Sequence, residues 1–178
     1  MKETGIFNLL SNSKIKSLQD YILGVEVGLD SNARKNRTGK TMESLIESYI
    51  QNTGYKYNET YFNQIGYADF NNKFSIDLSS YIKETVNKKF DFVINKGSKF
   101  FAIEVNFYNS KGSKLNETAR SYKEIAIETK HIKNFSFVWI TDGKGWESSK
   151  KNLQDTFNSM EHIYNLNDVE NGLFKNLK

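Results

Sequence analysis

Residues 135–140, Phe-Ser-Phe-Val-Trp-Ile, form an almost unbroken apolar run. A strand with one wet face alternates polar and apolar side chains, so this run predicts a strand buried on both faces, as in a parallel sheet. Helical patterns precede it at about 115–131 and follow it to about 160. A helical crossover then joins a strand at 100–108 to the run, which makes the two strands parallel and the connection right-handed. The chain is predicted to be an α/β protein, a three-layer sandwich with a central mixed sheet.

The whole chain, residues 1–178, is long enough for one domain with a substantial core. A helical segment is expected at about 1–30. Short aromatic and alternating segments at 55–80, including 74–78, are expected to form strands or an irregular insertion. The tail at 163–177 is expected to form a short strand and a final helix.

An amphipathic helix is predicted at about 40–53, because its apolar residues recur at helical spacing. Thr38 or Thr41 is expected to cap its start, and Gly54 to end it. Residues 24–40, rich in glycine and charge, are expected to form a connector before this helix.

Two apolar runs that read as strands carry the polar residues of greatest interest. Asp91 lies within 88–94, and Glu104 and Asn106 lie within 100–108. Side chains alternate along a strand, so Glu104 and Asn106 share one face. A hairpin turn at 95–98 would place Asp91 on the same face whenever the loop has an even length.

The length of the hairpin loop decides how the carboxylates face each other. A loop of residues 96–97 places Asp91 across from Ala102 and diagonal to Glu104, whereas a four-residue loop places it directly across from Glu104. Either way the two carboxylates lie roughly 5–8 Å apart. They would repel each other without a cation between them, and hard oxygen ligands suit Mg²⁺. The alternative is an ordinary hairpin with a wet polar face.

Composition excludes several other chemistries. The absence of cysteine rules out disulfides and thiolate metal sites, and two histidines argue against a histidine-based zinc site or catalytic triad. No apolar run is long enough to span a membrane and no signal-peptide pattern is present, so we expect a cytoplasmic protein without a membrane partner. The net charge of +4 permits a nucleic-acid partner.

Arginine is scarce in the chain, yet two of its three arginines fall in one short basic stretch. Arginine suits bidentate contacts to guanine or phosphate, and lysine contacts phosphate. We therefore expect DNA contacts from this stretch, with a solvated basic loop as the alternative. Its members are Arg34, Lys35, Arg37 and Lys40.

Several strings give the chain a family resemblance. They are residues 24–30, 34–39, 90–94, 104–108, 112–123 and 139–146. On these strings the chain resembles the DpnII/MboI family of type II restriction endonucleases, within the PD-(D/E)xK nuclease superfamily and its restriction-endonuclease-like fold. The resemblance covers the C-terminal part of longer family members. It implies Mg²⁺-dependent cleavage of double-stranded DNA at GATC, blocked by adenine methylation, and a partner DNA adenine methyltransferase.

The resemblance also implies site roles. Asp91 and Glu104 correspond to the metal ligands, where a bound Mg²⁺ polarises the scissile phosphate and activates water. Asn106 stands where the superfamily usually has lysine. Asn106 cannot act as a base or carry charge, so we expect it to orient water; an amide bonded to backbone is the alternative.

A cation is then sought elsewhere. Lys111 and Lys114 follow the second strand, and Ser113 with Lys114 begins a helix whose backbone N–H groups favour a phosphate; a solvated loop with a helix cap is the alternative. A helix glutamate often completes the superfamily's metal site. Glu43 occupies that place, with Glu47 as its rival and a solvated helix face as the alternative.

A palindromic target has two-fold symmetry, so a homodimer with one active site per strand is the natural assembly. Two other functions remain open from the sequence. One is a repair or junction-resolving nuclease with the same core, and the other is a DNA-binding remnant that does not cleave.

Overall fold

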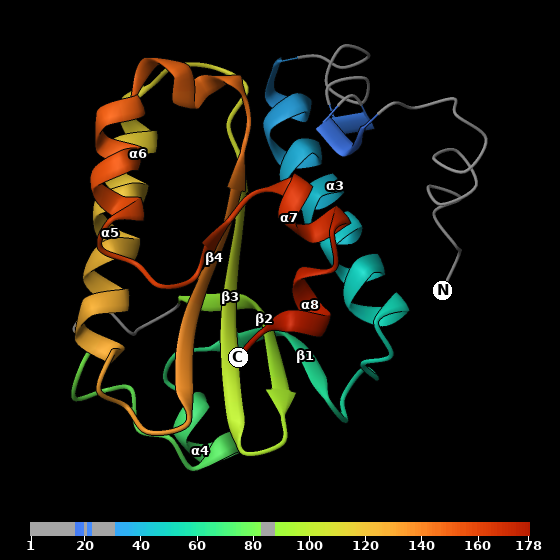
Figure 1. Cartoon of the computed structure of the whole chain (residues 1–178), viewed down its shortest axis with the longest axis vertical. Coiled ribbons are helices and arrows are strands. Elements are labelled where there is room, and N and C mark those ends of the chain that lie inside the picture. The colour runs from blue at the N-terminus through green and yellow to red at the C-terminus, as the bar shows by residue number, and fades with distance from the viewer. Residues whose placement is uncertain (1–16, 20, 23–30, 83–87) are drawn as a thin grey trace.

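Five strands form one sheet at the centre of the molecule (Figure 1). The computed structural model describes residues 17–19, 21–22, 31–82 and 88–178, with the backbone alone at 31–38. The strands lie in chain order, with the first three antiparallel and the last three parallel. Their bounds are β1 Tyr61–Gly66, β2 Lys89–Lys96, β3 Lys99–Phe107, β4 Phe135–Asp142 and β5 Ile163–Tyr164. The predicted mixed sheet, with 100–108 parallel to 135–140, is confirmed.

Helices cover both faces of this sheet, which confirms the three-layer α/β architecture (Figure 1). One face carries α3 (Ser31–Asn52), α7 (Leu166–Glu170) and α8 (Leu173–Asn176). The other face carries α5 (Ser113–Thr129) and α6 (Lys150–Phe157), and the 3₁₀ helix η1 (Lys144–Ser148) connects β4 to α6. Within the described residues no helix is both long and apolar enough to cross a membrane.

Strand alternation divides the core into two clusters. On the α3 face, Phe101, Ile103 and Val105 of β3 pack with α3, as the alternation predicted. On the α5 face the cluster is largely aromatic, and Phe70 of α4 (Phe70–Phe74) makes edge contacts with Phe90, Phe100 and Phe135. Burying such side chains stabilises the fold by about 1.5–3 kcal/mol each.

The β2–β3 hairpin confirms the predicted pair of strands and corrects the turn. The loop is the two-residue turn Gly97–Ser98, with Lys96 paired to Lys99 and the described pairing ending at Phe92–Ile103. Gly97 has a φ of 71°, a conformation that glycine adopts without steric cost. The register is nevertheless the one expected of a four-residue loop. The additional pair Lys96–Lys99 shortens the loop to two residues without shifting the strands relative to each other.

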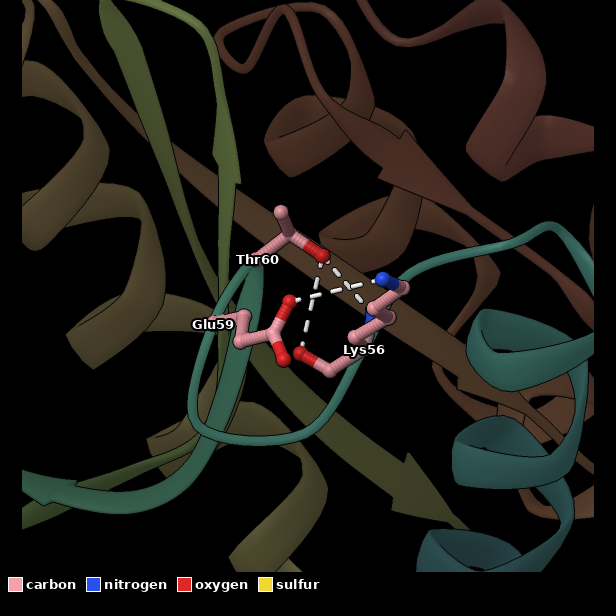
Figure 2. A network of polar contacts seen from close by, with 3 residues as sticks. All are labelled: Lys56, Glu59 and Thr60. Atoms are coloured by element: carbon pink, nitrogen blue, oxygen red, sulfur yellow. Dashed lines mark hydrogen bonds and ion pairs between the residues drawn. The ribbon is translucent and has the colours of Figure 1, made fainter.

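The edge strand β1 begins after a tight turn at 56–60 (Figure 2). The Thr60 hydroxyl accepts a 2.7 Å hydrogen bond from the Lys56 backbone N–H, and the Lys56 ammonium lies 3.6 Å from the Glu59 carboxylate. The ion pair is exposed, so the turn depends mainly on the hydroxyl bond and on backbone bonds to the Lys56 carbonyl. This turn leads into the strand that brings Gln64 and Tyr67 to the site described below.

The start of α3 was predicted wrongly. The helix begins at Ser31, so residues 31–40 are helical and are not a connector, and Thr38 and Thr41 lie inside the helix where they cannot cap it. Alanine, arginine and lysine favour helix, and one internal glycine, Gly39, costs only about 1 kcal/mol. Gly54 does follow the helix end, with a φ of 102°.

Three further expectations met different outcomes. Residues 74–78 are not a strand, because α4 ends at Phe74 and Ser75 turns the chain with a φ of 58°. The tail forms β5 and then two helices instead of one, which Gly172 separates with a φ of 87°. Most of the segment at 1–30 lies outside the described residues, although residues 18–19 and 21–22 are helical.

Candidate active site

Asp91 lies where β2 and β3 stop pairing. Continuing the hairpin register by one step places it opposite Glu104. Its carboxylate accepts a 2.9 Å hydrogen bond from the backbone N–H of Val105 and a longer one, 3.4 Å, from Gln64. The Val105 N–H is therefore bonded to the Asp91 side chain, and the backbone hydrogen bonds between β2 and β3 end at this position.

The alternation of β2 breaks at the same position. Phe92 belongs to the α3-face cluster, whereas Phe90 belongs to the α5-face cluster, although regular alternation would place residues two apart on one face. The neighbouring strand is also irregular, because Gln64 has a φ of 54°. Asp91 is therefore held between β2 and β3 by a local distortion, and not by simple alternation.

Glu104 is buried on the α5 face, with 7% of its surface exposed. Each of its carboxylate oxygens accepts a hydrogen bond from a tyrosine hydroxyl. Tyr67 donates to Oε1 at 3.0 Å and Tyr122 donates to Oε2 at 2.9 Å. Each carboxylate oxygen thus accepts one hydrogen bond from a neutral donor, and the two donors come from two other parts of the chain.

Burial dominates the electrostatics of this pair. Burial, reinforced by the charge of Asp91, raises the pKa of Glu104 to about 8, against the effect of its two tyrosine hydrogen bonds. Burial also raises the pKa of Asp91, opposed by the hydrogen bonds that it accepts. Both tyrosine hydroxyls have a raised pKa, from burial and from the nearby Glu104 carboxylate, and act as donors. A cation beside the pair would relieve this cost.

The two helix glutamates differ in their surroundings. Burial and the charge of Asp91 raise the pKa of Glu43, whereas the exposed Lys40 one turn earlier lowers it. Glu47 instead accepts a 2.9 Å hydrogen bond from the hydroxyl of Tyr61. Of the two glutamates, Glu43 is thus the one whose pKa is raised by the charge of Asp91. Among the described residues, no three Asp, Glu, His or Cys side chains are grouped closely enough to hold a metal ion.

Asn106 is oriented by a tryptophan. The indole N–H of Trp139, on the neighbouring strand, donates to Asn106 Oδ1 at 3.0 Å. Because an indole N–H can only donate, the carboxamide oxygen must face Trp139 and the amide N–H groups must point elsewhere. Asn106 therefore presents its amide N–H groups to the rest of the site, while its oxygen accepts the hydrogen bond from Trp139.

The predicted phosphate-binding residues lie at the end of the sheet where β3 and β4 terminate. The N-terminal ends of α3 and α5 both reach this end (Figure 1). Lys111, Ser113 and Lys114 are exposed at or just before the start of α5, and Lys40 is exposed further along α3. Arg34, Lys35 and Arg37 belong to the first turns of α3, and their side chains lie outside the described part of the chain.

The turn after β4 supports the loop that carries Lys111. Gly145 N–H donates to the Tyr108 carbonyl at 2.8 Å, and a Cβ on Gly143, which has a φ of 115°, would collide with that carbonyl. Residues 142–145 thus lead directly from β4 into η1.

Sequence reasoning missed the aromatic partners of this site. Tyr122 packs against the core from α5, and Trp139 is fully buried in β4. A buried tyrosine or tryptophan usually finds a partner for its polar atom, and that rule was the available signal. Tyr67 had no such signal, because its place depends on how the irregular segment after β1 folds.

A mixed sheet flanked by helices, with a pair of carboxylates where two strands part, is consistent with a restriction-endonuclease-like fold. A family model described as DpnII restriction endonuclease matches residues 1–176. The chain belongs to this family. None of the solved structures matches it significantly.

Three relatives illustrate the similarity. The type II restriction enzyme DpnII of Streptococcus pneumoniae is 50% identical over 100% of this chain. The type II restriction enzymes MjaIII of Methanocaldococcus jannaschii and MboI of Moraxella bovis are 46% and 39% identical over 99% and 93% of it. The matched part is 62%, 61% and 55% of these relatives, respectively, so the chain spans about three fifths of their length.

Proposed function

We propose that this chain is the nuclease part of a type II restriction endonuclease that hydrolyses phosphodiester bonds of double-stranded DNA at unmethylated GATC with Mg²⁺. The observation that carries the proposal is the pair formed by half-buried Asp91 and buried Glu104, which lies where β2 and β3 separate. Membership of the DpnII family supplies the reaction class. The GATC target is what the resemblance to the DpnII/MboI family implies.

The donor set fits a hard divalent cation. Asp91 and Glu104 would hold Mg²⁺, with Glu43 nearby on α3 as a further acid. Mg²⁺ typically takes one or two protein carboxylates and completes its shell with water and substrate phosphate, so a cluster of three acids is unnecessary. When bound, the ion supplies Lewis acidity at the scissile phosphate.

Asn106 would donate hydrogen bonds at the position where the superfamily usually has a lysine donor. With its oxygen bonded to Trp139, its amide N–H groups are available to a phosphate oxygen or to the attacking water. It carries no charge, so Lys111 and Lys114 would supply the positive charge from the loop beside it. Ser113, at the start of α5, would bind phosphate together with the backbone N–H groups.

DNA would approach along the end of the sheet that carries the basic residues. Lysine contacts there would neutralise phosphates and make binding dependent on salt. A two-fold symmetric target favours a homodimer, and a DNA adenine methyltransferase would protect the host's own sites. The proposed DNA-binding residues are Arg34, Lys35, Arg37, Lys40, Lys111 and Ser113.

The test is digestion of plasmid DNA, with and without adenine methylation at GATC, in the presence of Mg²⁺. We expect fixed fragments with ends at GATC from the unmethylated plasmid only. Asp91→Ala and Glu104→Ala should each reduce cleavage by more than about 10³-fold while binding to DNA persists.

Each other outcome has a definite meaning. Cleavage without fixed fragments would indicate a repair or junction-resolving nuclease. A shift of DNA in a gel with no cleavage in Mg²⁺ or Mn²⁺ would indicate a binding remnant. Normal cutting by either alanine variant would show that the metal ligands were assigned wrongly.

A further inference from the structure

Glu104 is held in an unusual way for a metal ligand. Both of its oxygens accept hydrogen bonds from tyrosine hydroxyls, at 3.0 Å from Tyr67 and 2.9 Å from Tyr122. The two donors come from different elements, one from the segment after β1 and one from α5. Packing alone does not require the two hydroxyls, because phenylalanine would provide the same ring at each position.

The two tyrosine rings are fixed by aromatic packing. Tyr67 is 2% exposed and stacks on Phe90, the residue before Asp91, with ring centroids 4.0 Å apart. Tyr122 makes edge contacts with Phe137 and Trp139, with centroids 5.4 and 5.3 Å apart. The hydroxyls therefore sit at defined points and cannot turn away from Glu104 without repacking the core.

This arrangement determines which part of the carboxylate remains open. A carboxylate offers about four lone-pair positions, two on each oxygen. Each tyrosine occupies one position on its own oxygen, so one position per oxygen remains for a cation. The carboxylate can neither rotate nor change rotamer without breaking a hydrogen bond in a buried site.

We propose that Tyr67 and Tyr122 are positioning residues that fix the Glu104 carboxylate for metal binding and thereby set the affinity for the divalent cation. The inference rests on the proposed function of the Asp91–Glu104 pair. Residues that orient metal ligands typically contribute 10- to 100-fold to metal affinity or activity. The same range is expected here for loss of either hydroxyl.

The test measures Mn²⁺ binding to the whole chain without DNA, from the electron paramagnetic resonance signal of free Mn²⁺. Tyr67→Phe and Tyr122→Phe should each raise the Kd for Mn²⁺ about 10- to 100-fold. Tyr61→Phe is the matched control, because Tyr61 is also fully buried and also donates to a glutamate, Glu47, outside the pair. Its Kd should stay within about twofold of the wild type.

Asp91→Asn distinguishes failure of the proposed metal site from failure of the proposed positioning role. If it raises the Kd strongly while both tyrosine variants bind Mn²⁺ like Tyr61→Phe, the metal site stands and the positioning role is overturned. If Asp91→Asn binds as the wild type does, the proposed metal site is wrong, and the positioning role with it. Thermal unfolding of each phenylalanine variant identifies any change due to misfolding, and tighter Mn²⁺ binding by either would also overturn the proposal.

Discussion

The two faces of the central sheet bury different kinds of side chain. The α3 face is closed mainly by aliphatic residues such as Ile94, Ile103 and Val138, and these side chains have no polar atom to satisfy. The α5 face buries Glu104 and the half-buried Asn106 among aromatic residues. There, each polar group has a hydroxyl or indole donor that comes from another element.

The difference shows what each face contributes. The α3 face contributes stability through buried apolar area, which is roughly proportional to the area removed from water. The α5 face gives up some stability to hold polar groups in fixed directions, since an unpaired buried polar atom costs about 1–3 kcal/mol. Substitutions on the two faces should therefore change different measurements.

The largest change in stability is expected on the α3 face. Ile94→Ala removes a fully buried side chain from β2, at the end remote from Asp91, and should lower the free energy of unfolding by about 2–5 kcal/mol. Ile127→Ala on α5 is the matched control, because Ile127 is 49% exposed, and its effect should stay within about 0.5 kcal/mol. Urea unfolding with unchanged slope measures both, and equal losses would contradict the assigned core.

Prediction from sequence succeeded where one rule decided the outcome. Unbroken apolar runs and strand alternation were enough for the order of strands β2 to β4 and for the apolar members of β3. The α3 start failed because glycine and charge were taken as signs of a connector, although most of those residues tolerate helix well.

The juxtaposition of Asp91 and Glu104 was expected for a reason that is only partly right. Alternation accounts for Glu104 and Asn106, but Asp91 reaches the pair through the irregularity at Gln64 and the break in β2. Such distortions depend on contacts between strands that are distant in sequence. The aromatic donors Tyr67, Tyr122 and Trp139 could not be paired with their acceptors until the layers were assembled.

On the α5 face, the free energy of unfolding should depend on pH because Glu104 is buried there. Glu104 has a pKa near 8 when folded and near 4.5 when unfolded, so the folded state holds its proton more tightly and stability falls as pH rises between these values. Glu104→Gln cannot lose a proton. Without metal, the free energy of unfolding of the variant relative to that of the wild type should therefore rise by on the order of 2 kcal/mol between pH 5.5 and 7.

The measurement is chemical unfolding at several pH values in the presence of a chelator. Asp91, whose raised pKa acts in the same direction, and the nearby Lys88 remain in both proteins, so the difference reports the titration of Glu104 together with its coupling to Asp91. A difference that stays constant from pH 5.5 to 8.5 would mean that Glu104 is charged throughout, contrary to its burial.

The smallest effect is expected from the indole that orients Asn106. Trp139→Phe keeps an aromatic ring but removes the N–H, so the carboxamide can turn and the cleavage rate should fall roughly tenfold, about 1.4 kcal/mol in transition-state stabilisation. Mn²⁺ affinity should change far less than in the two tyrosine variants, because Asn106 is not a proposed ligand and phenylalanine keeps an aromatic ring beside Tyr122. Trp146→Phe is the matched control, since its indole donates to Thr141 at 3.0 Å, and its cleavage rate should stay within about threefold of the wild type. Equal losses of rate in the two variants would point to general loosening of the aromatic core, whereas a loss confined to Trp139→Phe would mean that the direction of one amide matters for cleavage.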